Sequence, residues 1–168
     1  KNKQLIQAAE TDALTSAYNK RSTEERIHNV LQEHPQEPGT FVIMDVDHFK
    51  EVNDIYGHIT GDKVLHKFGE VLHEHFREGD IVGRIGGDEF VVFMRKTDSR
   101  EVAVSRIESL IKKVEELSFT EMNGKNITIS AGMAFAPEHG TGYLDLHKNA
   151  DTALYKTKQN GRDGYNIY

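Results

Sequence analysis

Carboxylates follow two strand-like runs in this sequence, and their spacing could hold a metal ion. In the first, an apolar run leads directly into Asp-Val-Asp at 45–47; in the second, Gly-Gly-Asp-Glu at 86–89 lies between two apolar runs. Burying or crowding carboxylates costs free energy unless a cation or hydrogen bonds compensate. If the two strand ends meet in a sheet, they predict a shared Mg²⁺, with Asp45 and Asp88 as its first ligands.

The paired glycines identify the second acidic segment as the tip of a β-hairpin. Gly86 and Gly87 can take the positive φ that a tight two-residue turn requires, and they have no side chains to block a phosphate. A Gly-Gly hairpin with exposed acids is by itself more often a plain turn, and this alternative stays open for the hairpin alone. Mg²⁺ usually keeps waters and needs only one or two carboxylates beside substrate phosphates, so no all-protein cage is expected.

A polar, glycine-containing segment at 48–62 follows the first acids and is interpreted as a ligand-contacting loop. Asn53 and Asp62 suit guanine, because an amide can engage its carbonyl or ring nitrogen and a carboxylate accepts from N1–H and the exocyclic amine. Adenine offers no matching N1–H donor. Alternatively, Asn53 forms an Asx turn and Asp62 favours the positive end of the following helix.

Cations near the end of the last helix are candidates for binding phosphate. Lys158 and Arg162 are four residues apart, and Lys50 could join them from the polar segment. Lysine and arginine bind terminal phosphates through charge-assisted hydrogen bonds. The alternative is that Lys158 and Arg162 are surface residues that complement the helix dipole.

The composition favours one compact domain that binds a small ligand. The 168 residues, 37% of them hydrophobic, suffice for one core, and the absence of cysteine excludes a disulfide framework and a thiolate zinc site. A net charge of −6 argues against binding a nucleic-acid polymer but allows a small phosphorylated ligand. The nine histidines lack metal-ligand spacing and are expected mostly at the surface.

The two ends of the chain and its apolar runs bear on location. No apolar run approaches the roughly 20 residues that span a bilayer, so no membrane segment is expected in this chain. We expect a cytoplasmic location, with membrane attachment of a parent protein left open. The chain does not begin with Met and starts on a short amphipathic segment, so we expect a fragment of a longer parent protein.

Helix-like and strand-like patterns alternate along the chain. Apolar residues at helical spacing predict helices around 5–9, from the capping-box pair Ser22 and Glu25 to 31, at 64–76, from Asp98 and Glu101 to 114, and at 146–154. Strands are predicted at 40–46, 81–85, 89–95 and 127–130, with an edge strand at 165–168. The alternation predicts an α/β (α+β) sandwich in which helices cover a central sheet.

Three spaced motifs resemble the GGDEF family of diguanylate cyclases. They read R-I-G-G-D-E-F at 84–90, D-V-D-H-F-K-E-V-N-D-I-Y-G-H-I-T-G-D at 45–62 and A-D-T-A-L-Y-K-T-K-Q-N-G-R at 150–162. The resemblance covers 12–168 and leaves 1–11 as the end of an N-terminal signalling or linker helix, which implies that a sensor domain is missing at the N-terminus. It implies a mostly antiparallel sheet with a ferredoxin-like core, similar to class III nucleotide cyclases and polymerase palms.

The implied reaction condenses two GTP into cyclic di-GMP and releases two pyrophosphates. Asp45, the Val46 carbonyl and Asp88 match the family's Mg²⁺ ligands, with Mn²⁺ as a possible substitute. Glu89 matches a carboxylate that binds metal or activates the attacking 3′-hydroxyl, and a two-metal arrangement is expected. The implied substrate contacts are Asn53 and Asp62 on guanine, Leu65 lining its pocket, the backbone around His48 and Phe49 with Lys50, Lys158 and Arg162 on the phosphates, and Gly86 and Gly87 leaving room.

The resemblance also implies an assembly and a feedback site. Each domain is expected to hold one GTP, so turnover requires a homodimer with facing sites. Arg77 and Asp80, separated from Gly86 by the five residues 81–85, match the family's R-x-x-D inhibitory motif, with Arg84 as a helper for binding cyclic di-GMP. The alternative is a local Arg77–Asp80 ion pair.

The sequence departs from the family pattern near its N-terminus, and two rival functions stay open. Ser16 and Ala17 stand where Gly-Leu is usual, and Lys20 where Arg is common, which puts in doubt only how the N-terminal segment couples to the domain. One rival is a catalytically silent module that binds GTP or cyclic di-GMP. Another is an enzyme that makes cyclic GMP-AMP, which Asp62 disfavours, or that only hydrolyses GTP.

Overall fold

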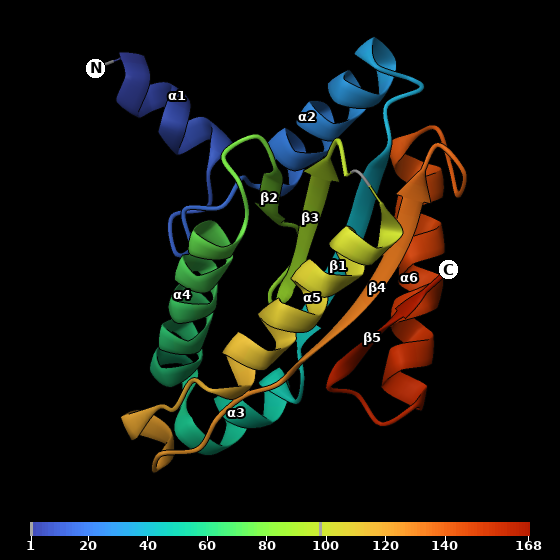
Figure 1. The fold of residues 1–168 in the computed structure, drawn as a ribbon. Helices are drawn as coiled ribbons and strands as arrows, with labels where there is room; N and C mark the ends of the chain where they lie inside the picture. Colours follow the sequence, from blue (N-terminus) through green and yellow to red (C-terminus); the bar gives the residue numbers. More distant parts are fainter. Residues whose placement is uncertain (1, 98) are drawn as a thin grey trace.

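The computed structural model describes residues 2–97 and 99–168, which form one sheet with helices on both faces (Figure 1). The strands run in the order β2-β3-β1-β4-β5, and only the β4–β5 pair is parallel. Their bounds are β1 Gly39–Val46, β2 Ile81–Arg84, β3 Glu89–Arg95, β4 Ile129–Ala136 and β5 Gly164–Ile167. The predicted fold class, a mostly antiparallel sheet covered by helices, is confirmed, and β5 lies at an edge as predicted.

Six α-helices and one short 3₁₀-helix accompany the sheet within the described ranges. Their bounds are α1 Asn2–Glu10, α2 Lys20–Glu33, α3 Phe49–Tyr56, α4 His58–His75, α5 Arg100–Glu115, the 3₁₀-helix Thr120–Met122 and α6 Tyr143–Gln159. None of these helices is both long enough and apolar enough to cross a membrane.

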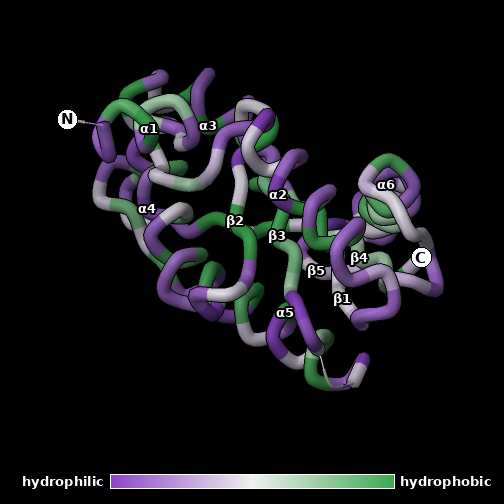
Figure 2. The backbone as a smooth tube through the Cα atoms, turned by 90° about the horizontal axis from the view of Figure 1, so that it is seen from above, coloured by the Kyte–Doolittle hydropathy of each residue, from purple (hydrophilic) through white to green (hydrophobic). Residues whose placement is uncertain are grey.

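Alternate residues of β1 divide the core into two layers. Val42 and Met44 pack with the apolar faces of α4 and α5, whereas Phe41 and Ile43 pack with those of α2 and α6. This alternation follows from the two-residue repeat of a strand, which sends successive side chains to opposite faces. In Figure 2 the tube is green along β2 and β3 in the middle, and the surrounding helices alternate between green and purple. β1 is buried throughout because both faces are covered.

The predicted capping box of the second helix is wrong. α2 begins at Lys20, and the Asn19 side chain caps it by accepting from the Ser22 backbone N–H at 2.9 Å. The helix starts early because the chain leaves the sheet edge just before it: Tyr18 N–H donates to Val82 O at 3.0 Å. Asp98, expected to open the fifth helix, lies outside the described residues, and Ser99 caps α5 through the Val102 N–H at 3.3 Å.

The strand predicted at 127–130 is misplaced, because β4 runs from Ile129 to Ala136. Its later half contains small residues that lack the usual strand signal of β-branched and aromatic side chains. The packing of α6 explains them: a Cβ added at Gly132 would overlap the Ala150 carbonyl and the Leu154 amide. The small side chains let α6 lie directly on the sheet.

The polar segment 48–62 is helical, so its interpretation as a loop is wrong. α3 and the start of α4 occupy it, and Gly57 joins them with φ of +90°, a value that L side chains rarely adopt. Val52 is buried against the core while most of its α3 neighbours face outward, and the dense polar groups hid this one-sided pattern. The helical pair presents its polar side chains from a fixed frame.

Candidate functional site

The two acidic strand ends meet in the sheet. β1 and β3 are antiparallel neighbours, and Asp45 lies directly opposite Glu89. Residues opposite each other in such a pair share one face of the sheet, and here this is the face that α6 covers. Asp88 immediately precedes β3. The register therefore gathers three carboxylates at one end of the sheet.

Asp45 is the least satisfied of these carboxylates. Its side chain is 11% exposed, and its Oδ2 lies 2.5 Å from Lys158 Nζ, whereas its buried Oδ1 has no hydrogen-bond partner among the described residues. Burial raises the pKa of Asp45, Lys158 opposes the shift, and Asp88 and Asp47 add to it. A buried carboxylate oxygen without a donor is costly, so this atom is suited to a ligand from outside the protein.

Asp88 and Glu89 share this electrostatic condition. Burial is the largest cause that raises the pKa of each carboxyl group. For Asp88 a backbone hydrogen bond and the charges of Lys158 and Arg84 oppose the shift; for Glu89 the charge of His147 opposes it, while Asp151 and the other acids add to it. Crowded like charges that resist ionisation are stabilised by a cation.

The donor set fits a divalent cation that prefers oxygen. The orphaned Oδ1 of Asp45, the neighbouring Asp88 and the main chain at Val46 offer hard oxygen atoms, as Mg²⁺ requires. Within residues 2–97 and 99–168, no three His, Asp or Glu side chains converge into a ready metal cage. The protein therefore supplies only part of a coordination shell, and a phosphorylated substrate is suited to supply more.

The hairpin tip is longer than predicted. β2 ends at Arg84 and β3 begins at Glu89, and the N–H groups of Ile85 and Gly86 both donate to Glu89 O, at 2.9 and 3.3 Å. Neither Gly86 nor Gly87 is among the described residues with positive φ, so the predicted two-residue turn is wrong. A Cβ at Gly87 would meet no atom within 4 Å, so the fold itself does not require glycine there. The glycines instead keep the tip free of side chains.

Arg84 braces this loop, a role that the sequence did not reveal. Its Nε and Nη2 donate to Gly87 O at 3.0 and 2.7 Å, and Nε also reaches Gly86 O at 3.2 Å. Its Nη1 lies 3.1 Å from both carboxylate oxygens of Asp12, which also accepts from the Thr15 N–H and hydroxyl. Arg84 thus links the N-terminal segment to the acidic loop. Its expected help in binding product stays a prediction.

The candidate guanine ligands lie on adjoining helices. Asn53 is half-buried on α3, and its amide oxygen lies against Gly61, where a Cβ would overlap it. Asp62 follows on α4 and is exposed. The alternative Asx turn is wrong, because Asn53 lies inside a helix. Leu65 is buried in the core beneath this pair, so its contact with a base stays a prediction.

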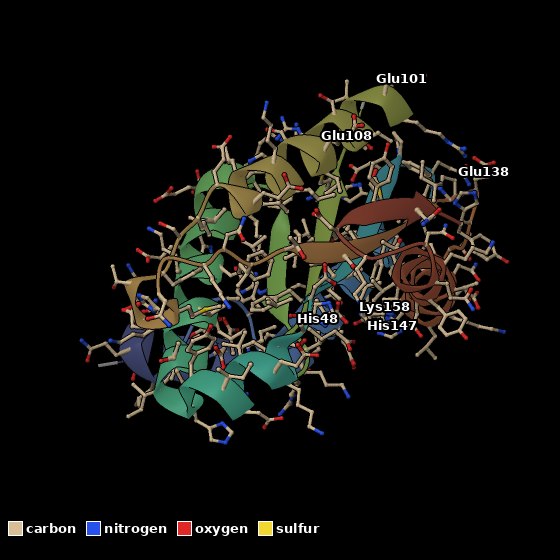
Figure 3. All side chains as sticks on the ribbon, turned by 90° about the horizontal axis from the view of Figure 1, so that it is seen from below. His48, Glu101, Glu108, Glu138, His147 and Lys158 are labelled. Atoms are coloured by element: carbon tan, nitrogen blue, oxygen red, sulfur yellow. The ribbon has the colours of Figure 1, made fainter. Side chains whose placement is uncertain are left out.

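The candidate phosphate ligands come from the start of α3 and the end of α6. Figure 3 looks onto the molecule from below and labels His48, which precedes α3, and Lys158 on α6. His48 is left-handed (φ 57°), and the free N–H groups of Phe49 and exposed Lys50 begin the helix, a position that suits an anion. Arg162 follows α6, and its N–H donates to Thr157 O at 3.0 Å.

The R-x-x-D pair lies at the opposite end of the hairpin and forms the local ion pair named as its alternative. The Asp80 side chain is 1% exposed and accepts from the N–H groups of Arg77 and Arg95, at 3.0 and 3.2 Å. Arg77 Nη2 lies 3.4 Å from Asp80 and donates to Arg95 O at 2.6 Å. Asp80 therefore holds the turn and orients Arg77.

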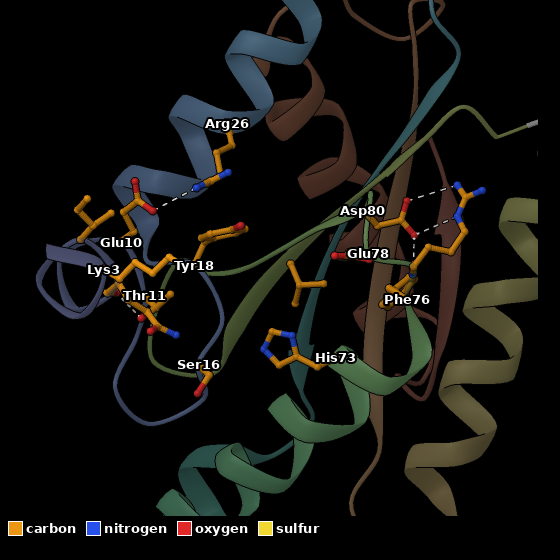
Figure 4. Close-up of a pocket in the computed structure, with 14 residues that line it drawn as sticks. Lys3, Glu10, Thr11, Ser16, Tyr18, Arg26, His73, Phe76, Glu78 and Asp80 are labelled. Carbon is orange, nitrogen blue, oxygen red and sulfur yellow. Dashed lines mark hydrogen bonds and ion pairs between the residues drawn. The ribbon is translucent and has the colours of Figure 1, made fainter. Parts of the chain in front are cut away.

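A cavity of about 670 Å³ opens beside this turn (Figure 4). Residues of α1, α2 and the end of α4 line it, and Arg77 and Asp80 are among its lining residues. Arg26 stacks over the Tyr18 ring at 4.1 Å and pairs with Glu10 at 3.1 Å. The role of Arg77 and Asp80 in product binding stays a prediction.

Comparison with known families and curated proteins finds similarity along nearly the whole chain. The model "Diguanylate cyclase, GGDEF domain" matches residues 9–164. The chain is 34% identical over 166 residues to the bifunctional diguanylate cyclase/cyclic di-GMP phosphodiesterase MucR of Pseudomonas aeruginosa, covering 98% of this chain and 24% of that protein. It is 33% identical to the probable diguanylate cyclase DgcC of Escherichia coli, covering 96% of this chain and 44% of that one.

Solved structures show the same fold. The coiled coil and GGDEF domain of DgcB from Caulobacter crescentus, in complex with c-di-GMP, superposes with a TM-score of 0.90 at 25% identity, covering 99% of this chain and 90% of that one. The present chain spans less than half the length of the two curated relatives. The likeness is that of a domain within larger proteins.

Proposed function

The chain belongs to the diguanylate cyclase GGDEF domain family, and from that premise we propose that it condenses two GTP into cyclic di-GMP and releases two pyrophosphates. One observation carries this proposal: Asp45 Oδ1 is buried beside Asp88 and Glu89 and has no hydrogen-bond partner within residues 2–97 and 99–168. A buried carboxylate oxygen without a donor costs free energy and gives a catalytically inactive domain no benefit. In a metal-dependent phosphoryl-transfer site, the same oxygen can bind the cation.

Asp45, the Val46 carbonyl and Asp88 are the proposed ligands for Mg²⁺ or Mn²⁺, and Glu89 is a further candidate. Bound metal supplies charge neutralisation on the triphosphate and polarisation of the attacking hydroxyl. Glu89 is the proposed proton acceptor for that hydroxyl, since its burial-raised pKa makes it a stronger base than an exposed glutamate. Lys158, now paired with Asp45, is positioned to exchange that carboxylate for a phosphate oxygen.

The other residues bind and orient the nucleotide. Asn53 and Asp62 are the proposed guanine ligands, and the carboxylate at 62 favours GTP over ATP because only guanine offers N1–H and an exocyclic amine. The start of α3 with Lys50, and Arg162 after α6, are the proposed phosphate contacts. The exposed glycines of the hairpin loop leave room for the ligand.

Turnover requires two copies in this proposal. One domain offers one nucleotide site, so the 3′-hydroxyl of one GTP attacks the α-phosphate of the other across a twofold axis. The exposed Leu5 and Ile6 on α1 suit pairing of N-terminal helices under the control of an upstream sensor in a cytoplasmic setting.

The direct test is incubation with GTP and Mg²⁺ over a range of protein concentrations, with chromatographic identification of the product. Cyclic di-GMP that rises more than linearly with protein, and that is lost in Asp88→Ala, is the expected result. Asp145→Ala is the matched control, because Asp145 is exposed at the far end of α6. GTP binding without product at any concentration would instead indicate a receptor module.

Product feedback has its own test. Arg77→Ala removes the guanidinium that Asp80 orients, so inhibition by added cyclic di-GMP should weaken by about tenfold or more while uninhibited turnover is kept. Initial rates at increasing product concentration measure it. Unchanged inhibition would leave Arg77 as a structural partner of Asp80 only.

A further inference from the structure

Asp47 is a buried carboxylate whose hydrogen bonds are all made within the protein. It is 4% exposed, and it follows β1 directly. Its Oδ1 accepts from the Ser130 hydroxyl at 2.6 Å, and its Oδ2 accepts from the Thr128 hydroxyl at 2.7 Å and from the Asp163 N–H at 3.0 Å. No described cation forms an ion pair with it. Hydrogen bonds alone compensate this buried charge, so the geometry of its donors is tightly set.

The bond to Asp163 reaches a strained turn. Gly161, Arg162 and Asp163 follow one another with φ of 105°, 66° and 44°. Two consecutive non-glycine residues in the left-handed region are unfavourable and persist only where surrounding contacts impose them. Here the anchors are known: Arg162 N–H donates to Thr157 O on one side, and Asp163 N–H donates to Asp47 on the other. Arg162 is therefore held between two fixed points.

Asp47 also lies at the start of the segment that leads into α3. The Asp47 N–H donates to Thr128 O at 2.9 Å, and the next residue, His48, turns left-handed into the helix start. The main chain of Asp47 thus fixes one candidate phosphate-binding element, and its side chain fixes the other. The two elements come from different parts of the sequence, and one residue, Asp47, links them through its main chain and its side chain.

We propose that Asp47 is a positioning residue of the nucleotide site, which acts by holding the left-handed turn that presents Arg162 to the GTP phosphates. This inference rests on the proposed function, because it takes Arg162 as a phosphate ligand. The carboxylate itself does not touch the substrate. Its bonds to Thr128 and Ser130 tie the end of β1 to the start of β4, whereas only its bond to Asp163 reaches the turn.

A double-mutant cycle on nucleotide affinity separates positioning from general support of the sheet. The dissociation constant of a non-hydrolysable GTP analogue is measured by calorimetry with Mg²⁺ for the whole chain. Asp47→Ala and Arg162→Ala should each weaken binding by about tenfold, and the double variant should bind no more weakly than Arg162→Ala alone. Asp47→Asn should restore most of the affinity, since an amide oxygen can still accept from Asp163 N–H.

Ser130→Ala is the matched control, because it removes one sheet contact of Asp47 and leaves the Asp163 bond. It should change affinity less than twofold. Additive losses from Asp47→Ala and Arg162→Ala, or an equal loss in Ser130→Ala, would overturn the positioning role while leaving the cyclase proposal intact. Failure of the unmodified chain to bind the analogue would instead contradict the proposed function.

A second variant covers the case in which Asp47→Ala does not fold. Asp47→Glu keeps the charge but displaces the carboxylate by one methylene, so it should also weaken binding in a manner that depends on Arg162. Faster hydrogen exchange at the Asp163 amide in Asp47→Glu should accompany the loss. Unchanged exchange and unchanged affinity in this variant would refute the inference.

Discussion

The β2–β3 hairpin has acidic residues at both ends, and the two ends differ in how those acids are satisfied. At the start of β2, Asp80 accepts from two backbone N–H groups and from Arg77, and its charge is fully bonded. At the other end, Asp88 and Glu89 resist ionisation, and Asp45 on the neighbouring β1 keeps a buried oxygen that has no hydrogen-bond partner among the described residues. The first end therefore has all its charges bonded. The second, which we call the charge-deficient end, gathers Asp45, Asp88 and Glu89 around one directly paired cation, Lys158.

Burial alone therefore does not distinguish a carboxylate that stabilises the fold from one that can bind a metal ion. Asp47 makes the same point two residues from Asp45, since it is buried more deeply and yet fully bonded. The useful question for each buried carboxylate is which donors the fold supplies. Where the fold supplies none, a cation or substrate is required.

The largest loss of activity is expected when one acid is removed from the charge-deficient end. Asp88→Asn should reduce cyclic di-GMP formation by at least about 100-fold, because a ligand to the catalytic cation is lost. Its free energy of unfolding should stay the same or rise, since the crowding of like charges is relieved. Product assays and chemical denaturation measure the two effects. Full activity in Asp88→Asn would refute the metal site.

The reciprocal change is made at the completed end. Asp80→Ala leaves the N–H groups of Arg77 and Arg95 without an acceptor, so it should lower the free energy of unfolding by about 2–3 kcal/mol. Turnover well below the melting temperature should change only a few-fold. Denaturant titration gives the stability, and Glu78→Ala, at an exposed neighbour, is the control. Loss of activity without loss of stability would reverse the assignment of the two ends.

Arg84 holds the loop at the charge-deficient end through hydrogen bonds to its backbone, so a change at Arg84 tests how far the site depends on that loop. Arg84→Lys keeps the charge but cannot reach Asp12 and both loop carbonyls together. We expect kcat to fall by about tenfold with KM for GTP nearly unchanged, and stability to fall by about 1 kcal/mol. Arg21→Lys, in an exposed pair with Glu25, should do neither. A change in KM alone would indicate a direct contact of Arg84 with substrate.

The smallest expected effect is the pH dependence of stability. The folded-state pKa values of Asp45, Asp88 and Glu89 are raised, so the stability from their protonated forms is present below the ordinary carboxyl pKa and lost as pH rises through the folded values. Mg²⁺ binds the ionised forms and should stabilise the protein more as pH rises. Melting temperatures between pH 5 and 8, with and without Mg²⁺, test this linkage. Equal stabilisation at every pH would contradict it.

The sequence predicted best what depends on local pattern. Alternation and helical spacing placed β1, β3 and the apolar faces of α4, α5 and α6, and the meeting of Asp45 with the Asp88 segment followed from two strand ends in one sheet. The sequence did not predict an element correctly where a packing partner distant in the sequence determines its structure. The small residues of β4 are strand-forming only because α6 lies on them.

The site residues divide in the same way. Side-chain types and spacing indicated the acids, the candidate guanine pair and the cations. They did not indicate Arg84 as a brace, because two of its acceptors are the backbone carbonyls of Gly86 and Gly87, which carry no side-chain signal, and the third, Asp12, is distant in the sequence. The partners of Asp47 lie on two later elements, at Thr128, Ser130 and Asp163, so only the folded chain shows that its charge is satisfied.

We expect the hairpin end with Asp88 and Glu89 to bind a divalent cation and the end with Asp80 to bind none. Mn²⁺ binding, followed by electron paramagnetic resonance with a non-hydrolysable GTP analogue present, tests it in three proteins: the unmodified chain, Asp45→Asn and Asp80→Asn. We expect tight Mn²⁺ binding in the unmodified chain and in Asp80→Asn, and affinity lower by at least about tenfold in Asp45→Asn. Equal Mn²⁺ binding in all three proteins, or none beyond the nucleotide's own, would contradict it.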